Sequence, residues 1–491
     1  MTATLLEQLR TFHITGHGLA EFAAAITVDD FDAAPLPAEP ADFCAGAAIA
    51  FPISALLAKR GPLRAQFTEQ LRQVAERLED LLALDDSHAA GAVSKNNLGA
   101  AAQYFRVDNL DAVMRRRANP VLRMAPERRE RCQHALATLR QALAIVHPPF
   151  TLFHQDGHIP DTLHGDLHVS ADPCAAALDY ALNQLHAITP ALKALRVARL
   201  DLDDAYDPPV HDPILHRFRW EAAGAGELAA QSPVIAVLTA AQAAATSLCS
   251  FTRLLRSGCP VLLIVTQPVF CQQDLACDAP DFAQLAMTYR DAFILQSSLG
   301  APEHFRAAVD ALAKTLRPAL AVVATPSGGG WAESVILAQS AASPLFTFDP
   351  AAGPRFRDCL HVQPPGPNPW TAAHAVGLNP AVQSHFRRIP LDTPERDTFE
   401  LSEYLRLYEQ RAPLAIPVLT LRSRERVAIS RDVAEYCHDR QQARSRLAEW
   451  GAAAPAPEPG KIDSNEVAMR EAAQRAFAQA IALVTKEGGK S

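Results

Sequence analysis

The fold class of this chain is decided by two apolar runs, Pro233-Val-Ile-Ala-Val-Leu-Thr239 and Val261-Leu-Leu-Ile-Val-Thr266, which an alanine-rich helical segment separates. Three further apolar runs follow, each after a helical segment, at 292–296, 319–324 and 344–348. Strands that are buried on both faces read as continuous apolar runs, and helices are the usual connections between parallel strands. The pattern predicts an α/β fold, namely a three-layer sandwich around a parallel sheet.

The regions on either side of these runs have a different character. Upstream, amphipathic segments at 65–86 and 125–146 predict helices, and 172–200 reads as two helices broken near Pro190. Downstream, proline-rich loops alternate with short helices until the tract GAAAPAPEPG interrupts the chain before a last amphipathic segment.

These shifts in pattern divide the chain into five expected units. They are a mainly helical N-terminal region of unknown role (1–170), the α/β domain (171–355), a C-terminal α+β extension (356–450), a linker (451–462) and a C-terminal helix (463–491).

Composition and charge limit the function classes. The 491 residues contain 46 Lys plus Arg and 54 Asp plus Glu, a formal net charge of −8 at pH 7, and 49% are hydrophobic. That balance is typical of a globular protein, and the negative charge argues against nucleic acid or an anionic membrane as the main partner.

No run approaches the roughly 18 apolar residues that predict a membrane span, and the first residues lack the pattern of a signal peptide. We expect a soluble, cytoplasmic protein.

A basic run, Arg115-Arg116-Arg117, lies within 95–131, where two short helical segments are joined by a turn. A helix-turn-helix that reads DNA has this rhythm. The net negative charge and the lack of other basic stripes favour a solvated helical face instead. We therefore expect no nucleic-acid partner.

The nine cysteines are odd in number, widely spaced and without a C-x-x-C pair. Iron–sulfur modules and zinc ribbons need closely spaced cysteines, so we expect no iron–sulfur cluster and no zinc ribbon in this chain. Reduced, mostly buried thiols are the expectation. For the group Cys249, Cys259, Cys271 and Cys277 we expect no redox role.

Several segments of the α/β region resemble the thiamine-diphosphate-binding domain of pyruvate:ferredoxin (flavodoxin) oxidoreductases. The similar stretches are LLRSGCPVLLIVTQPVF at 254–270, DFAQLAMTYRDAFILQSSLGAPEHFRAAVDAL at 281–312, ALAVVATPSGGG at 319–330 and AQSAASPLFTFDP at 338–350. The resemblance covers about 170–450, and it implies a thiamine-diphosphate-binding type of fold that works with partner subunits.

The residues that hold the cofactor in that family are absent here. The resemblance places the family's Gly-Asp-Gly turn on Thr239-Ala240-Ala241, a further family aspartate on Ala245, and the start of its second metal-binding segment on Gln267. A carboxylate normally binds Mg²⁺, which neutralises the diphosphate, and an unpaired buried charge is very costly. We therefore expect a degenerate pocket that binds neither thiamine diphosphate nor Mg²⁺.

The family's cysteine-containing loop is replaced by the glycine-rich turn Ser327-Gly328-Gly329-Gly330, which Trp331 follows. A helix N-terminus after such a turn can bind an anion through backbone N–H groups. The turn matches no established phosphate-binding pattern, which favours an ordinary connection between strand and helix.

A second candidate site lies just upstream, where four histidines and three aspartates occur within 154–168. In a strand, His164, Asp166 and His168 share one face and form a candidate metal site, with zinc as one suitable ion. Neutral surface histidines in a hairpin are the competing interpretation. The run His164-Gly-Asp-Leu-His168 also resembles the catalytic loop of aminoglycoside and choline kinase-type phosphotransferases, but Ala171 stands where that loop has its asparagine.

We expect a 2-oxoacid:ferredoxin oxidoreductase-like pseudoenzyme, an accessory or scaffold subunit that has a protein partner or forms a homo-oligomer. One alternative is active oxidative decarboxylation of a 2-oxoacid together with partner subunits. The other is a metal-dependent enzyme that uses the His154–His168 cluster.

Overall fold

The computed structural model describes residues 2–17, 19, 22, 26–31, 36, 39, 46–87, 123–155, 159–246, 248–268, 281–326, 330–340, 342–364, 370–390, 398–406, 408 and 415–451. Arg115 to Arg117, the predicted helix over 463–491 and all but the first residue of the predicted linker 451–462 lie outside this part of the chain. Every helix within the described ranges is too short or too polar to cross a bilayer.

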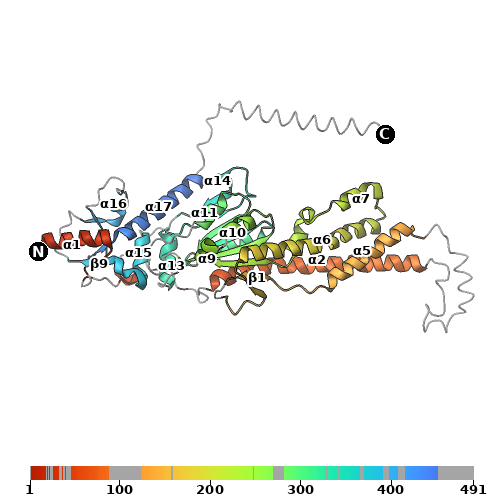
Figure 1. Ribbon diagram of the computed structural model, residues 1–491, viewed down its shortest axis with the longest axis horizontal. Coiled ribbons are helices and arrows are strands. Elements are labelled where there is room, and N and C mark those ends of the chain that lie inside the picture. Colours follow the sequence, from red (N-terminus) through yellow and green to blue (C-terminus); the bar gives the residue numbers. More distant parts are fainter. Residues whose placement is uncertain are drawn as a thin grey trace, which may run out of the picture.

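The protein is elongated, with a larger sheet near its middle (Figure 1). A smaller sheet and the N-terminal helix lie at one end, and long helices extend from the larger sheet toward the other end. The larger sheet has the strand order β2-β1-β3-β4-β6-β5-β7-β8, and the smaller one has the order β10-β11-β12-β9.

The larger sheet is parallel from β2 through β5, whereas β7 runs antiparallel to β5 and to β8. Its strands are β1 (Thr151–His154), β2 (Asp166–Val169), β3 (Val234–Thr239), β4 (Val261–Pro268), β5 (Phe293–Ser298), β6 (Ala319–Thr325), β7 (Phe346–Phe348) and β8 (Leu360–Val362). The α/β class and the five apolar strands are thus confirmed. The expectation that all five are parallel is wrong for β7, because Phe346 pairs with Gln296 and the chain enters β7 near the carboxyl end of β5.

Helices cover both faces of this sheet. They are α2 (Ala47–Ser87), α6 (Pro173–Leu202), α9 (Ala240–Thr246), α10 (Leu248–Leu255), α11 (Phe282–Met287), α12 (Pro302–Lys314), α13 (Gly330–Gln339) and α14 (Phe356–Cys359). Along β3, Val234, Ala236 and Leu238 pack with α6, α10 and α11, whereas Ile235 and Val237 pack with the start of α2 and with α12. Alternate side chains of a strand point to opposite faces, which is why both faces must be apolar.

Two sequence expectations differ from the structure around α6. The sheet begins upstream of the expected boundary at residue 171, since β1 pairs in parallel with both β2 and β3. The prediction of two helices broken near Pro190 is wrong, because α6 continues through that residue. Both halves of α6 are packed, the first on the sheet and the second on α2 and α5, which offsets the backbone hydrogen bond that a proline removes.

The helical arm consists of residues 67–87, 126–144, 188–202 and 208–216. Its helices are the second half of α2, α5 (Pro126–Ala144), the second half of α6 and α7 (Pro208–His216). A separate apolar core joins them, with Leu78 of α2, Leu139 of α5 and Leu195 of α6 fully buried in it. The short elements η5 (Trp220–Ala222) and α8 (Ala225–Ala229) lead back to β3.

The smaller sheet forms the C-terminal α+β unit. Its elements are η2 (Val28–Asp30), α15 (Ala372–Leu378), η6 (Pro380–His385), β9 (Phe386–Ile389), β10 (Thr398–Glu400), α16 (Leu401–Arg406), β11 (Ile416–Thr420), β12 (Arg426–Ile429) and α17 (Arg431–Gly451). The N-terminal helix α1 (Thr2–Thr15) packs on this sheet through Leu9 and Phe12. The start of the chain therefore belongs with this C-terminal unit.

Candidate functional site at the carboxyl edge of the larger sheet

The positions that the sequence singled out for cofactor binding meet at one edge of the larger sheet. Thr239 ends β3 and lies beside Thr266 in β4, and the next residue, Gln267, lies beside Ala324 of β6. Strand order reverses at β1, which has β2 on one side and β3 on the other. In open α/β sheets ligands bind outside the carboxyl ends of the strands at such a reversal. The structure thus brings the predicted positions to the place where a ligand is expected.

The first turn of α9 hydrogen-bonds to itself at this edge. The backbone N–H of Thr239 donates to Oε1 of Gln242 at 2.8 Å, and the backbone N–H of Gln242 donates to Oγ1 of Thr239 at 3.2 Å. This reciprocal arrangement is a capping box, and its sequence signature is a Ser or Thr followed three residues later by Glu or Gln. Thr239-Ala-Ala-Gln242 carries this signature, which was not among the sequence predictions.

The alanines at the expected ligand positions are placed in two different ways. Ala240 is fully buried, whereas Ala241 and Ala245 are exposed on α9. None of the three side chains has an oxygen that could bind a cation. The capping box stabilises the start of α9, and the three alanine side chains at these positions carry no cation ligand.

The carboxylate nearest to this edge already has partners. Asp172 is the one acidic residue among the described residues within three positions after β1, β2 and β3. Its carboxylate caps α6 by accepting the N–H of Ala175 at 3.0 Å, and it accepts the hydroxyl of Ser250 in α10 at 2.5 Å. Asp172 therefore joins two helices.

A serine–histidine pair lies at the carboxyl end of β5. The hydroxyl of Ser297 and Nδ1 of His304 in α12 are 2.9 Å apart, and burial lowers the pKa of His304. Ser297 is completely buried, so a substrate has no access to its hydroxyl. The pair connects β5 to α12 and does not form a nucleophile.

The candidate metal residues lie along the edge strand β2. Asp166 and His168 are both in this strand, and Nε2 of His168 is 2.9 Å from Oδ2 of Asp166, with both side chains about half exposed. His164 precedes the strand, and the ring of His168 stacks on Phe153. Among the described residues no group of three or more His, Cys, Asp or Glu side chains is arranged to hold a metal ion. Asp156 and His158 of the cluster lie outside that part, and the metal site stays a prediction.

The cysteines and the glycine-rich turn contribute little to this edge. Cys249 is exposed on α10, whereas Cys259 is buried, and burial raises the pKa of its thiol. Cys271, Cys277 and residues 327–329 of the turn lie outside the described residues. Five of the six described cysteines are buried, which agrees with the expectation of mostly buried thiols.

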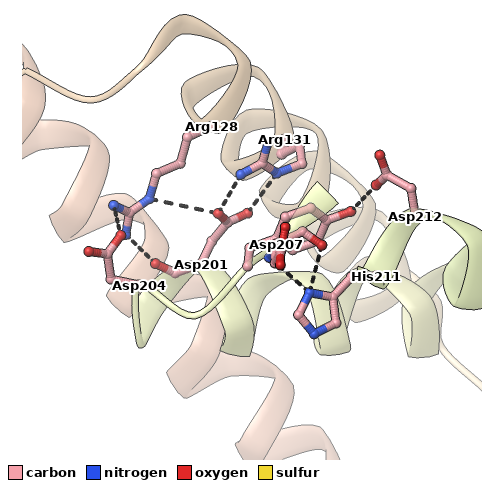
Figure 2. A network of polar contacts seen from close by, with 8 residues as sticks. Arg128, Arg131, Asp201, Asp204, Asp207, His211 and Asp212 are labelled. Atoms are coloured by element: carbon pink, nitrogen blue, oxygen red, sulfur yellow. Dashed lines mark hydrogen bonds and ion pairs between the residues drawn. The ribbon is translucent and has the colours of Figure 1, made fainter. Parts of the chain in front are cut away.

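A network of charges that the sequence did not predict lies on the helical arm (Figure 2). Arg131 makes a bidentate contact with the carboxylate of Asp201, with Nη2 at 2.9 Å and Nε at 3.3 Å. Arg128 donates to the backbone carbonyl of Asp201 and pairs with the carboxylate of Asp204. The side chain of Asp201 is 1% exposed. Arg128 and Arg131 of α5 therefore bind a buried and a surface carboxylate.

The comparisons with known proteins add no relative: neither a scan against protein-family models nor a search of curated proteins found a match to this chain.

Proposed function

We propose that this protein is a non-catalytic accessory subunit of a 2-oxoacid:ferredoxin oxidoreductase-type complex, built on a thiamine-diphosphate-binding type of domain whose cofactor site is lost. The sequence resemblance over about 170–450 suggests the family. The single observation that carries the loss of the site is the capping box between Thr239 and Gln242 at the expected diphosphate turn.

The strand arrangement supports the proposal of a thiamine-diphosphate-binding type of domain. The segment with the expected Gly-Asp-Gly position follows β3, and the segment with the expected second ligand begins within β4, its neighbour in the sheet. The two segments are separated in sequence but share the carboxyl edge, which is the arrangement that joint binding of one metal ion requires.

The side chains at this edge support the proposal that the cofactor site is lost. A diphosphate with its metal ion needs close backbone approach and carboxylate ligands. Here the N–H groups of Thr239 and Gln242 are already bonded to each other's side chains, and Ala240 and Ala245 replace carboxylates. The residues present do not fit thiamine diphosphate and Mg²⁺.

Calorimetric titration of the purified full chain with thiamine diphosphate and Mg²⁺ tests the lost site. We expect no saturable heat and no 2-oxoacid-dependent reduction of a viologen dye in the presence of coenzyme A. A micromolar dissociation constant would contradict the proposal and favour the alternative, active oxidative decarboxylation.

Isolation of the tagged chain from its native host, at its native level, tests the accessory role. We expect a stoichiometric companion chain that contains iron and sulfide, because the oxidative decarboxylation carried out by the oxidoreductase family needs an electron carrier. Recovery of the tagged chain alone, or only with copies of itself, would contradict the accessory role even if the titration showed no binding.

A further inference from the structure

The helical arm contains a cavity of about 910 Å³ between α5, α6 and α7. Small-molecule sites in proteins commonly have volumes of about 300–1,000 Å³ and are lined by apolar side chains with a few polar groups. Much of the wall is apolar, formed by Ala135 of α5, Ala194 and Val197 of α6, and Pro213 and Leu215 of α7. The cavity therefore has the size and the lining of a ligand site.

Positive charge predominates among the polar groups of the cavity. Arg131, Lys193 and Arg217 line it, together with His134 and His216. Neither Lys193 nor Arg217 forms an ion pair with any carboxylate in the described part of the chain. Two cations at an apolar cavity thus have no ion-pair partner among the residues that the structure describes.

The acidic groups nearby are already engaged. Asp212 is the one acidic residue that lines the cavity, and its Oδ1 accepts the hydroxyl of Tyr206 at 2.5 Å. Burial and this hydrogen bond raise the pKa of Tyr206 to about 12, so the phenol keeps its proton at neutral pH. The carboxylate of Asp201 is paired with the guanidinium of Arg131 (Figure 2).

The contacts of Arg131 with Asp201 and Tyr206 hold the α5 side of the cavity in place. The guanidinium of Arg131 is fixed by Asp201 and lies over the ring of Tyr206, 4.1 Å from the ring centroid. Figure 2 shows Arg128 and Arg131 both directed at Asp201, between α5 and the end of α6. A preformed wall lowers the entropic cost of binding, because these side chains do not have to be ordered by the ligand.

We propose that this cavity binds a small organic anion with an apolar body, whose carboxylate or phosphate is paired with Lys193 and Arg217. The apolar body packs against Ala194, Val197 and Leu215, and the charged group stays near the exposed Arg217. This site is far from the capped turn at Thr239 and does not depend on the proposed accessory function.

Fluorescence titration of the full chain with 8-anilinonaphthalene-1-sulfonate, an aromatic sulfonate, tests the site. We expect saturable binding that weakens about tenfold or more in both Lys193→Glu and Arg217→Glu, because each reversal removes a charged partner of the anion. Arg306→Glu is the matched control, since it reverses an exposed arginine of α12 outside this cavity. Circular dichroism melts confirm that all three variants are folded.

Competition against the bound dye defines the ligand class. Octanoate and octyl phosphate should displace the dye, octanol should do so at least about tenfold more weakly, and inorganic phosphate should not displace it. The tighter of the two anions identifies the preferred charged group. Equal effects of Lys193→Glu and Arg306→Glu, equal displacement by octanol, or displacement by inorganic phosphate alone would overturn the proposal.

Discussion

The carboxyl edge of the larger sheet and the helical arm use their polar groups in opposite ways. At the sheet edge, Thr239 and Gln242 bond to each other, and Asp172 caps a helix. On the arm, Asp201 is buried against two arginines, while Lys193 and Arg217 of the adjacent cavity have no ion-pair partner within the described residues. The polar groups at the sheet edge are engaged in local hydrogen bonds, whereas two cations beside the cavity of the arm are not engaged in ion pairs with the described residues.

A large effect should come from the buried charge of the arm. Asp201→Ala removes the buried carboxylate that Arg131 contacts in bidentate fashion, and should lower the free energy of unfolding by about 1.5–3 kcal/mol, the range for a hydrogen-bonded charged group, since Arg131 itself stays a quarter exposed to water. Asp204→Asn is the control: this side chain is 82% exposed and asparagine tolerates the left-handed backbone here (φ +53°), so the loss should stay below about 1 kcal/mol. Urea unfolding of both variants measures the difference. Equal losses would mean that the network carries no special stability and would break the comparison.

A glycine substitution should have opposite effects in the two regions. A Cβ on Gly300, at the carboxyl end of β5, would lie 2.1 Å from the backbone carbonyl of Ser334, so Gly300→Ala should destabilise the protein by about 3 kcal/mol. A Cβ on Gly226, in α8 beside the arm, would meet nothing within 4 Å, so Gly226→Ala should stabilise the helix by about 0.5–1 kcal/mol. Thermal melts of the two variants measure both signs. Destabilisation by Gly226→Ala would contradict the open space found there.

The smallest effect is a difference in sensitivity to pH. Burial lowers the pKa of His304 at the sheet edge below its usual 6.5, so its contribution to stability is complete above pH 6.5 and is lost as the pH falls toward the lowered value. On the arm, the N–H of Met124 donates to Asp85 and lowers the pKa of that carboxyl below 3.8. The contribution of Asp85 is therefore complete above about pH 3.8 and is lost only below it.

Urea unfolding at pH 7.5 and pH 5.0 separates these two windows. The stability difference between the wild type and His304→Gln should shrink from pH 7.5 to pH 5.0, whereas the difference between the wild type and Asp85→Asn should stay constant. The reverse pattern would show that the sheet edge is not the more acid-sensitive region.

Much of the candidate site at the sheet edge could be predicted from the sequence. The position of Thr239 at the end of a strand follows from the apolar run before it, and the capping box is readable from Thr239 and Gln242 alone. The pairing of Asp172 with Ser250 could not be predicted, because 78 residues separate the two side chains. Local hydrogen bonds leave a sequence signature, and contacts between distant segments do not.

The sequence by itself determined the α/β class, because a strand covered on both faces must be apolar along its whole length. Only the tertiary structure decided that β1 and β2 join the sheet, that β7 is antiparallel and that α1 packs on the C-terminal unit. It alone also made Asp201 a buried partner of Arg131, 70 residues away in the chain, and formed a cavity beside them. The physical reason is that strand order, buried ion pairs and cavities depend on which surfaces meet in space, and hydrophobic periodicity records only that a surface must be covered.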